Sequence, residues 1–286
     1  MHRRVAVGEL VLDFATDDPS ASAALQALYH AAPPAPPGGG TDRPADLHYR
    51  LNRRPEGWLA HSPARPPFGP TSLSDAWAFL EWRATEDLLA APRGAIYLHG
   101  AGICMGGRGV LLIGPSGAGK STLAAHLAAR GYRVWGDDLV RFAPVPRHFS
   151  ASERSWKLDD KSLSDIELLS EVCAGGAPGT FFAPPCWYVS PAAIRVDWRA
   201  EPGSAGVVVL LEASRHAGPA RVERTSEGAA ALEVAQALIG ADRVTTPGER
   251  ANLMTSVLEA LEDAVAFEAR GNSPRALAVA LEEALA

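Results

Sequence analysis

The chain alternates short apolar runs with longer segments whose apolar residues recur with helical period. Gly109–Ile113 and Gly206–Leu211 are runs of the first kind, and their continuous apolar character predicts buried strands. Ser121–Arg130 follows the first run and carries Leu123 and Leu127 four residues apart, which predicts a helix with one apolar face. Strands that alternate with helices in this way predict an α/β fold.

The same reasoning places the other elements of the chain. Ser74–Leu89 is expected to form a helix, capped by its first residue, that packs the N-terminal region against the sheet that follows. Arg250–Phe267 is expected to form one amphipathic helix, ended by Gly271. Further strands are expected at Val5–Val7, Leu10–Phe14, Leu47–Leu51, Trp58–His61, Ala95–Leu98, Ile103–Met105, Tyr132–Gly136 and Arg221–Arg224, and further helices at Ala21–Tyr29, Ser162–Cys173, Ser226–Leu238 and from Ser273-Pro274 onward.

Proline-rich stretches interrupt this pattern. Ala31–Gly40 reads AAPPAPPGGG and is expected to be a mobile surface loop, and Ser62–Pro70 is expected to be another loop. Residues 143–191 contain several prolines and are expected to form either a lid or substrate loop, or a poorly ordered insertion. We therefore divide the chain into a small α+β region over residues 1–92, with its mobile loops, and a larger domain over residues 93–286.

The segment between the first buried strand and its helix carries the clearest chemical motif. Residues 114–121 read GPSGAGKS and fit the pattern G-x-x-x-x-G-K-[ST] of a phosphate-binding loop. Glycines let backbone N–H groups turn toward an anion, and the helix adds the partial positive charge of its N-terminal end. Lys120 is expected to contact the β- and γ-phosphates, and the Ser121 hydroxyl to ligate Mg²⁺. The predicted nucleotide-binding residues are Gly114, Ser116, Gly117, Ala118, Gly119, Lys120, Ser121 and Thr122.

Two adjacent carboxylates, Asp137 and Asp138, follow the strand predicted after the loop helix. A carboxylate at such a strand end can hold Mg²⁺, directly or through water. A second carboxylate can take the proton of an attacking hydroxyl. Because neighbouring side chains of a strand point to opposite faces, the two residues are expected to divide these tasks. The alternative is an Asp-rich turn that only ends the strand.

Composition narrows the function further. The chain of 286 residues is 47% hydrophobic, carries a net charge of −6 and has no run of basic residues, which argues against a nucleic-acid partner. Its three cysteines form no C-x-x-C pair, so neither a disulfide framework nor a zinc site is indicated. No apolar run approaches the length of a membrane span, and no signal peptide is evident, so the expected compartment is the cytoplasm.

The loop, the paired aspartates and a histidine upstream together resemble the HPr kinase/phosphorylase family. His99-Gly100 lies fifteen residues before Gly114, and Arg130-Gly131 precedes a strand that ends in Asp137-Asp138. The resemblance covers residues 99–138. It implies a kinase core related to phosphoenolpyruvate carboxykinase, with ATP and Mg²⁺ as cofactors. It also implies that Asp138 accepts the proton of the substrate hydroxyl, that Asp137 lies near the metal with Ser121, and that His99 and Lys120 complete the catalytic set.

The sequence also departs from this family. Thr122 stands where Glu is usual, and the chain has no counterpart of the E-x-R-G-x-G stretch that supplies a second metal ligand; Glu153, Asp159 or Glu167 can substitute. The chain therefore looks closer to the divergent members, some of which phosphorylate a serine in a ribosomally made peptide such as a lasso-peptide precursor. We expect ATP-dependent phosphorylation of a serine in a peptide or protein. A small-molecule kinase, acting on free serine or another alcohol, and a nucleotide-binding regulator without kinase activity are the alternatives, and self-association into a homo-oligomer is open.

Overall fold

The computed structural model describes residues 2–7, 10–21, 45–90, 96–152, 154–160, 162, 166, 187–212, 218–239 and 246–286. The chain forms two compact units. The N-terminal unit comprises Met1–Gly94, Glu153–Lys161 and Glu171–Ser190. The C-terminal unit comprises Ala95–Ser152, Ser162–Ser170 and Pro191–Ala286. Among the described residues, no helix has the length and apolar character needed to cross a membrane.

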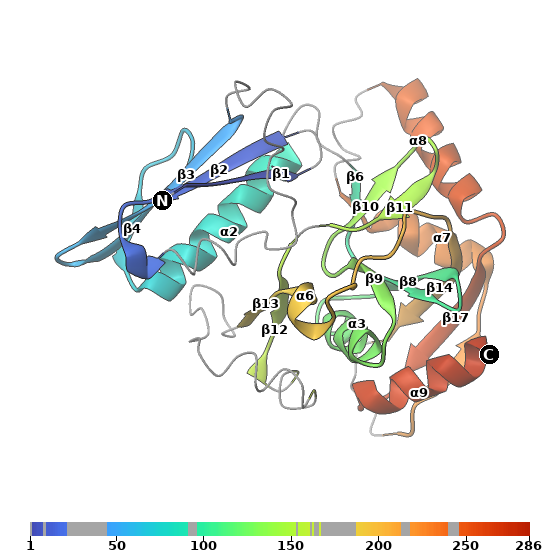
Figure 1. The fold of residues 1–286 in the computed structure, drawn as a ribbon. Coiled ribbons are helices and arrows are strands. Elements are labelled where there is room, and N and C mark those ends of the chain that lie inside the picture. Colours follow the sequence, from blue (N-terminus) through green and yellow to red (C-terminus); the bar gives the residue numbers. More distant parts are fainter. Residues whose placement is uncertain are drawn as a thin grey trace. The chain divides into compact units, whose positions relative to one another are not determined.

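The N-terminal unit is built on a five-stranded sheet of order β1-β2-β3-β4-β5 (Figure 1). Strands β2 and β3 are parallel, and the other neighbours are antiparallel. Two further strands of this unit, β12 (Trp156–Leu158) and β13 (Trp187–Val189), pair with each other. The remaining elements are β1 (His2–Val7), β2 (Leu10–Thr16), a 3₁₀ turn at Pro19–Ala21, β3 (Leu47–Arg54), β4 (Gly57–His61), β5 (Phe68–Thr71) and helix α2 (Leu73–Ala90).

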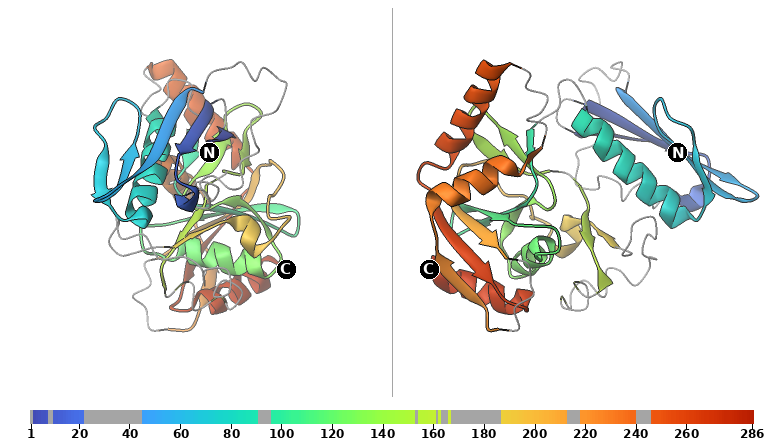
Figure 2. Two further views of the ribbon diagram at one scale, coloured as in Figure 1. Left: turned by 60° about the vertical axis from the view of Figure 1, so that its left-hand side comes forward. Right: turned by 180° about the vertical axis from the view of Figure 1, so that it is seen from behind.

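Helix α2 lies along one face of the five-stranded sheet (Figures 1 and 2). The buried Tyr49 donates a hydrogen bond from its hydroxyl to Asp87 of α2 at 3.0 Å. Phe68 stacks on Phe79 of the same helix, with 4.5 Å between the ring centroids. Because side chains alternate along a strand, His48 and the other even-numbered residues of β3 lie on the face turned away from α2.

The C-terminal unit contains a six-stranded sheet of order β15-β17-β14-β8-β7-β9 and a four-stranded sheet of order β11-β10-β6-β16. Helices α3 and α9 pack on one face of the six-stranded sheet, and α7 packs on the other (Figure 1). The main core of the unit lies on the α7 side, where Trp135, Phe142 and Val257 are buried in one cluster. The strands are β6 (Ile96–Leu98), β7 (Ala101–Met105), β8 (Arg108–Ile113), β9 (Arg133–Gly136), β10 (Val140–Ala143), β11 (His148–Ser150), β14 (Ala205–Leu211), β15 (Arg221–Arg224), β16 (Leu238–Ile239) and β17 (Val265–Arg270). The helices are α3 (Lys120–Ala129), α6 (Pro191–Ile194), α7 (Glu227–Gln236), α8 (Pro247–Ala260) and α9 (Pro274–Leu285).

Most predicted elements that fall on described residues are confirmed, with one large exception. The prediction of one helix over Arg250–Phe267 is wrong, because α8 ends at Ala260 and Val265–Arg270 forms β17. Its apolar residues continued the helical period by coincidence, whereas pairing with β14 and β15 on either side fixes the segment as a strand. Leu258 of α8 is 55% exposed, so it lies outside the buried face of that helix.

Three smaller expectations are also corrected. Ser72 rather than Ser74 caps α2, since its hydroxyl accepts from the N–H of Asp75 at 3.1 Å. The end of the expected loop Ser62–Pro70 lies in β5, which pairs with β4. Leu238, expected in a helix, belongs to β16. The predictions for Ala31–Gly40, for all of Ala21–Tyr29 after its first residue and for most of Ser162–Cys173 lie outside the described residues.

Candidate active site

Sheet topology brings three separate segments of the C-terminal unit to one edge. Strand β7 runs antiparallel to both of its neighbours, β8 and β9. The start of β7 therefore lies beside the ends of β8 and β9. His99 precedes β7, the phosphate-loop motif follows β8, and Asp137 follows β9 (Figure 1). The carboxyl ends of strands in open α/β sheets are where ligands usually bind.

Glycine conformation shapes the loop itself. Gly114 has a φ of 155°, and a Cβ there would lie 2.4 Å from the carbonyl oxygen of Leu211 in β14. Gly117 and Gly119 have φ values of 79° and 90°, and a Cβ on either would meet no described atom within 4 Å. The first glycine therefore permits a close approach of two backbones, whereas the other two set the turn and leave its outer side open. Gly119 is also the N-cap of α3, with no side-chain cap.

Lys120 begins α3 and lies under this loop. The residue is 6% exposed, and its ammonium donates hydrogen bonds to the carbonyl oxygens of Gly114 at 2.8 Å and Pro115 at 3.1 Å. Burial lowers the pKa of Lys120, and the charges of Asp137 and Asp138 oppose that shift. An ammonium has three donors, so one remains for a phosphate oxygen beside the loop. The loop and Lys120 together therefore fit a phosphate group.

His99 and Asp138 contact each other directly. The imidazole Nδ1 lies 3.2 Å from Oδ1 of Asp138 and 3.2 Å from the carbonyl oxygen of the same residue. Because both oxygens are acceptors, Nδ1 carries the proton. The hydrogen bond to the carboxylate raises the pKa of His99, against the opposing effects of burial and of Lys120. The backbone N–H of His99 donates a hydrogen bond to the carbonyl oxygen of Ala237 at 2.7 Å, which fixes the backbone from which this side chain extends.

The turn after β9 separates the two aspartates. Gly136 has a φ of 133°, and a Cβ there would lie 3.0 Å from Oγ of Ser152 and 3.1 Å from the carbonyl oxygen of Leu139. Asp138 adopts a left-handed φ of 65°. Asp137 is 2% exposed, whereas the side chain of Asp138 is 37% exposed. The two carboxylates therefore lie in different surroundings, one buried and one facing His99.

The oxygen donors near the loop are of the kind that Mg²⁺ prefers. Ser121 lies in the first turn of α3, and the charge of the buried Asp137 acts on neighbouring Lys120. Magnesium usually takes one or two protein oxygens together with waters and phosphate oxygens, so Ser121 and Asp137 fit that requirement. Of the three candidates for a second metal ligand, Glu153 and Glu167 lie outside the described residues, and Asp159 belongs to the N-terminal unit.

Other predicted residues have different surroundings. Thr122 has its hydroxyl 2.6 Å from that of Ser162, and Ala118 donates its N–H to Pro115 at 3.2 Å within the loop. Ser116 is exposed at the tip of the loop. Three basic side chains of residues 143–191 are paired with carboxylates: Arg154 and Lys157 with Glu81, and Arg147 with Glu259.

Sequence reasoning missed two residues that support this site. Gly136 permits the turn into the aspartates, and its position directly before them was the available signal. Ser162, which contacts the loop helix through Thr122, carried no motif.

Comparison with known proteins supports the resemblance drawn from the motifs. The chain is 33% identical over 110 residues to the HPr kinase/phosphorylase of Ralstonia pickettii, a match that covers 38% of this chain and 30% of that protein. It is 37% identical over 105 residues to the HPr kinase/phosphorylase of Lachnoclostridium phytofermentans, covering 32% of each chain. The similarity to HPr kinase/phosphorylases is thus confirmed for part of the chain, and that part spans about a third of each relative.

Two further comparisons are less informative. The Hpr(Ser) kinase/phosphatase of Coxiella burnetii aligns in structure with a TM-score of 0.31 and 11% identity, over 66% of this chain and 95% of that chain. No family model matches the sequence.

Proposed function

We propose that this protein is a divergent HPr-kinase-like enzyme that transfers the γ-phosphoryl group of ATP to a hydroxyl, that of a serine of a peptide or protein. The observation that carries the proposal is the contact of His99 with Asp138 at the sheet edge that also holds Lys120. Sequence similarity to HPr kinase/phosphorylases over part of the chain supports the same reaction type.

The residues divide the work of the proposed reaction. Backbone N–H groups of the loop and Lys120 hold the phosphates and neutralise charge that develops during transfer. The acceptor oxygen attacks the γ-phosphorus, its bond to phosphorus forms, and the bond to the β–γ bridging oxygen breaks as ADP leaves with the electron pair. Asp138 takes the proton of the acceptor hydroxyl, and His99 holds that carboxylate in place through Nδ1. Magnesium, held by Ser121 and Asp137, would neutralise phosphate charge when bound.

The substitution Asp138→Asn tests the assignment of the base. It keeps the size of the side chain and removes the proton acceptor, so nucleotide affinity should stay within about threefold while transfer falls about 10²–10⁴-fold. The measurement is transfer of label from [γ-³²P]ATP to serine-containing peptides, free serine and simple alcohols, alongside nucleotide titration. Retained transfer by the variant would refute the base assignment.

The same assay separates the proposal from its alternatives. Labelling of peptides supports the peptide kinase, and labelling of free serine alone supports a small-molecule kinase. ATP hydrolysis that no acceptor accelerates supports a nucleotide-binding regulator.

A further inference from the structure

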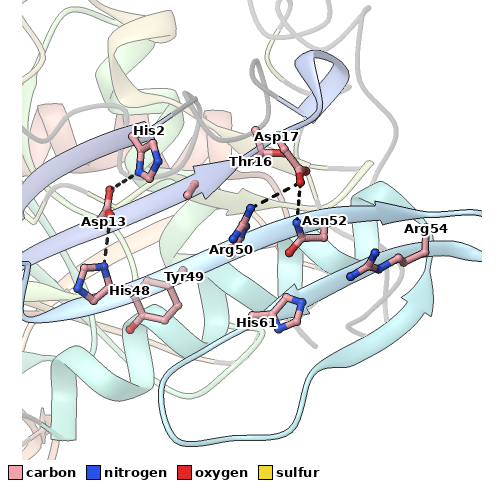
Figure 3. A pocket seen from close by; sticks show the side chains of 11 residues that line it. His2, Asp13, Thr16, Asp17, His48, Tyr49, Arg50, Asn52, Arg54 and His61 are labelled. Carbon is pink, nitrogen blue, oxygen red and sulfur yellow. Dashed lines mark hydrogen bonds and ion pairs between the residues drawn. The ribbon is translucent and has the colours of Figure 1, made fainter.

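The N-terminal unit contains a polar pocket that the proposed kinase reaction does not use. It has a volume of about 800 Å³ and lies on the face of the five-stranded sheet turned away from α2 (Figure 3). Its walls come from β1, β2, β3 and β4, so residues far apart in sequence meet there. A volume of this size is typical of pockets that bind small molecules or short peptide segments.

The carboxylates of this pocket already have partners. Asp13 is 5% exposed, with Oδ1 lying 3.4 Å from Nδ1 of His2 and Oδ2 lying 3.2 Å from Nδ1 of His48 (Figure 3). Asp17 accepts a hydrogen bond from Asn52 at 3.1 Å and lies 3.5 Å from the guanidinium of Arg50. Both carboxylates of the lining therefore have hydrogen-bond or ion-pair partners within it.

Two side chains of the same lining, His61 and Arg54, have no such partner among the residues that the structure describes. Nε2 of His61 is buried and makes no hydrogen bond with any described residue. Arg54 makes no hydrogen bond or ion pair with the described part of the chain. Arg50 is directly opposite His61 in the register of β3 and β4, and Arg54 follows on the same face (Figure 3). A buried polar atom without a partner is unfavourable, which applies to Nε2 of His61, whereas Arg54 is exposed to solvent. An oxyanion at this end of the pocket would accept a hydrogen bond from the Nε2–H tautomer of His61 and form an ion pair with Arg54.

We propose that this pocket binds an oxyanion, the carboxylate or phosphate group of a small ligand, through Arg54 and His61, with Arg50 as a third contact. Both carboxylates of the lining already have partners, Arg54 is a cation without one among the described residues, and His61 in its Nε2–H tautomer would add a donor, so the lining favours an anion. The oxyanion belongs either to a free small acid or to an acidic side chain of a peptide. This inference does not depend on the proposed kinase activity.

The test measures anion binding to the full chain carrying Lys120→Ala, which removes the phosphate-loop lysine from competition. The probes are inorganic phosphate, citrate and a decapeptide of alternating glutamate and threonine. Calorimetry gives the affinity, and the ring C–H signals of His61, assigned by comparison with His61→Gln, give the location.

Arg54→Ala should weaken binding at least tenfold. Arg53→Ala is the matched control, because Arg53 neighbours Arg54 on β3 but points to the opposite face and lies 3.6 Å from Asp18. That control should change the affinity less than twofold.

Binding of any probe that shifts His61 and is lost with Arg54→Ala supports the proposal. Phosphate or citrate alone indicates a free small acid, and the peptide alone indicates acidic side chains. If Arg54→Ala does not fold, His61→Gln takes its place with calorimetry as the readout, and a loss of at least fivefold is expected. Unchanged affinity in the variant tested, no binding of any probe, or binding that leaves the His61 signals unshifted overturns the proposal.

Discussion

The two proposed sites of this protein are built from different chemical groups, backbone N–H groups in one and side chains in the other. In the C-terminal unit, consecutive residues form the proposed phosphate loop, and the groups proposed to face the phosphate are mostly backbone N–H groups set by the φ values of Gly117 and Gly119. In the N-terminal unit, side chains from four strands form the pocket, and strand register alone brings Arg50 opposite His61. The first kind of site depends on backbone conformation and on one lysine. The second depends on which side chains occupy one sheet face.

The largest effect is expected from Lys120→Ala. Removal of the ammonium takes away the proposed point charge on the phosphates, so turnover should fall about 10²–10³-fold, the range seen when an electrostatic group of an active site is lost. Arg130→Ala, at the exposed end of the same helix, is the control and should keep ordinary turnover. Labelled-ATP assays and thermal melts of both variants check this. Turnover of the Lys120 variant near the wild-type level would contradict the proposed role of the loop.

The next largest effect is expected on the stability of the N-terminal unit. Glu81 of α2 is 1% exposed and pairs with Arg154 at 2.7 Å and with Lys157 at 3.2 Å. Glu81→Ala leaves Arg154 buried without its carboxylate, which typically costs about 3–5 kcal/mol.

We expect the free energy of unfolding of the N-terminal unit to fall by this amount, while the nucleotide affinity of the C-terminal unit stays the same. Denaturant titration and nucleotide binding measure the two effects. Glu86→Ala, on the same helix but exposed, is the control and should change stability by less than about 0.5 kcal/mol. An equal loss in both variants would show that the buried ion pairs have no special role.

A single methyl group tests how far the kinase site depends on the backbone. Gly136→Ala places a Cβ in a left-handed residue and against Ser152, so it should destabilise the protein by about 1–3 kcal/mol. It should also lower turnover, because it displaces the turn that carries Asp137 and Asp138.

Gly107→Ala is the matched control for that substitution. Gly107 has a φ of 80° in the hairpin between β7 and β8, and a Cβ there meets no described atom within 4 Å. It should cost stability and leave turnover unchanged. Thermal melts and kinase assays compare the two variants. An equal loss of turnover in both would show that Gly136 has no specific role in the site.

The smallest effect concerns the protonation of His99. Its contact with Asp138 raises its pKa, so in the folded protein the imidazolium persists above the ordinary value of about 6.5. The stability that this pair contributes is fully present below the unfolded pKa and is lost as pH rises through the folded value. NMR titration of His99 should show a lower pKa in Asp138→Asn than in the wild type. An unchanged pKa would contradict the contact.

The sequence by itself identified the parts of this protein that are contiguous. The motif GPSGAGKS, its strand and its helix were predicted together because one local rule of spacing specifies all three. The turn at Gly106-Gly107 has φ values of 56° and 80°, which glycine adopts most readily, so these two residues themselves specify it. Interactions between near neighbours in sequence determine features of this kind.

Tertiary structure decided what depends on distant pairings. Val265–Arg270 continued a helical apolar period, yet it is a strand because β14 and β15 pair with it from either side. The contact of His99 with Asp138 follows from the antiparallel insertion of β7 between β8 and β9. No sequence motif marks the pocket around Asp13 and His61, because the register between strands brings its residues together and their spacing along the chain does not. Local sequence fixes the conformation of a segment only weakly when hydrogen bonds from remote strands can outweigh it.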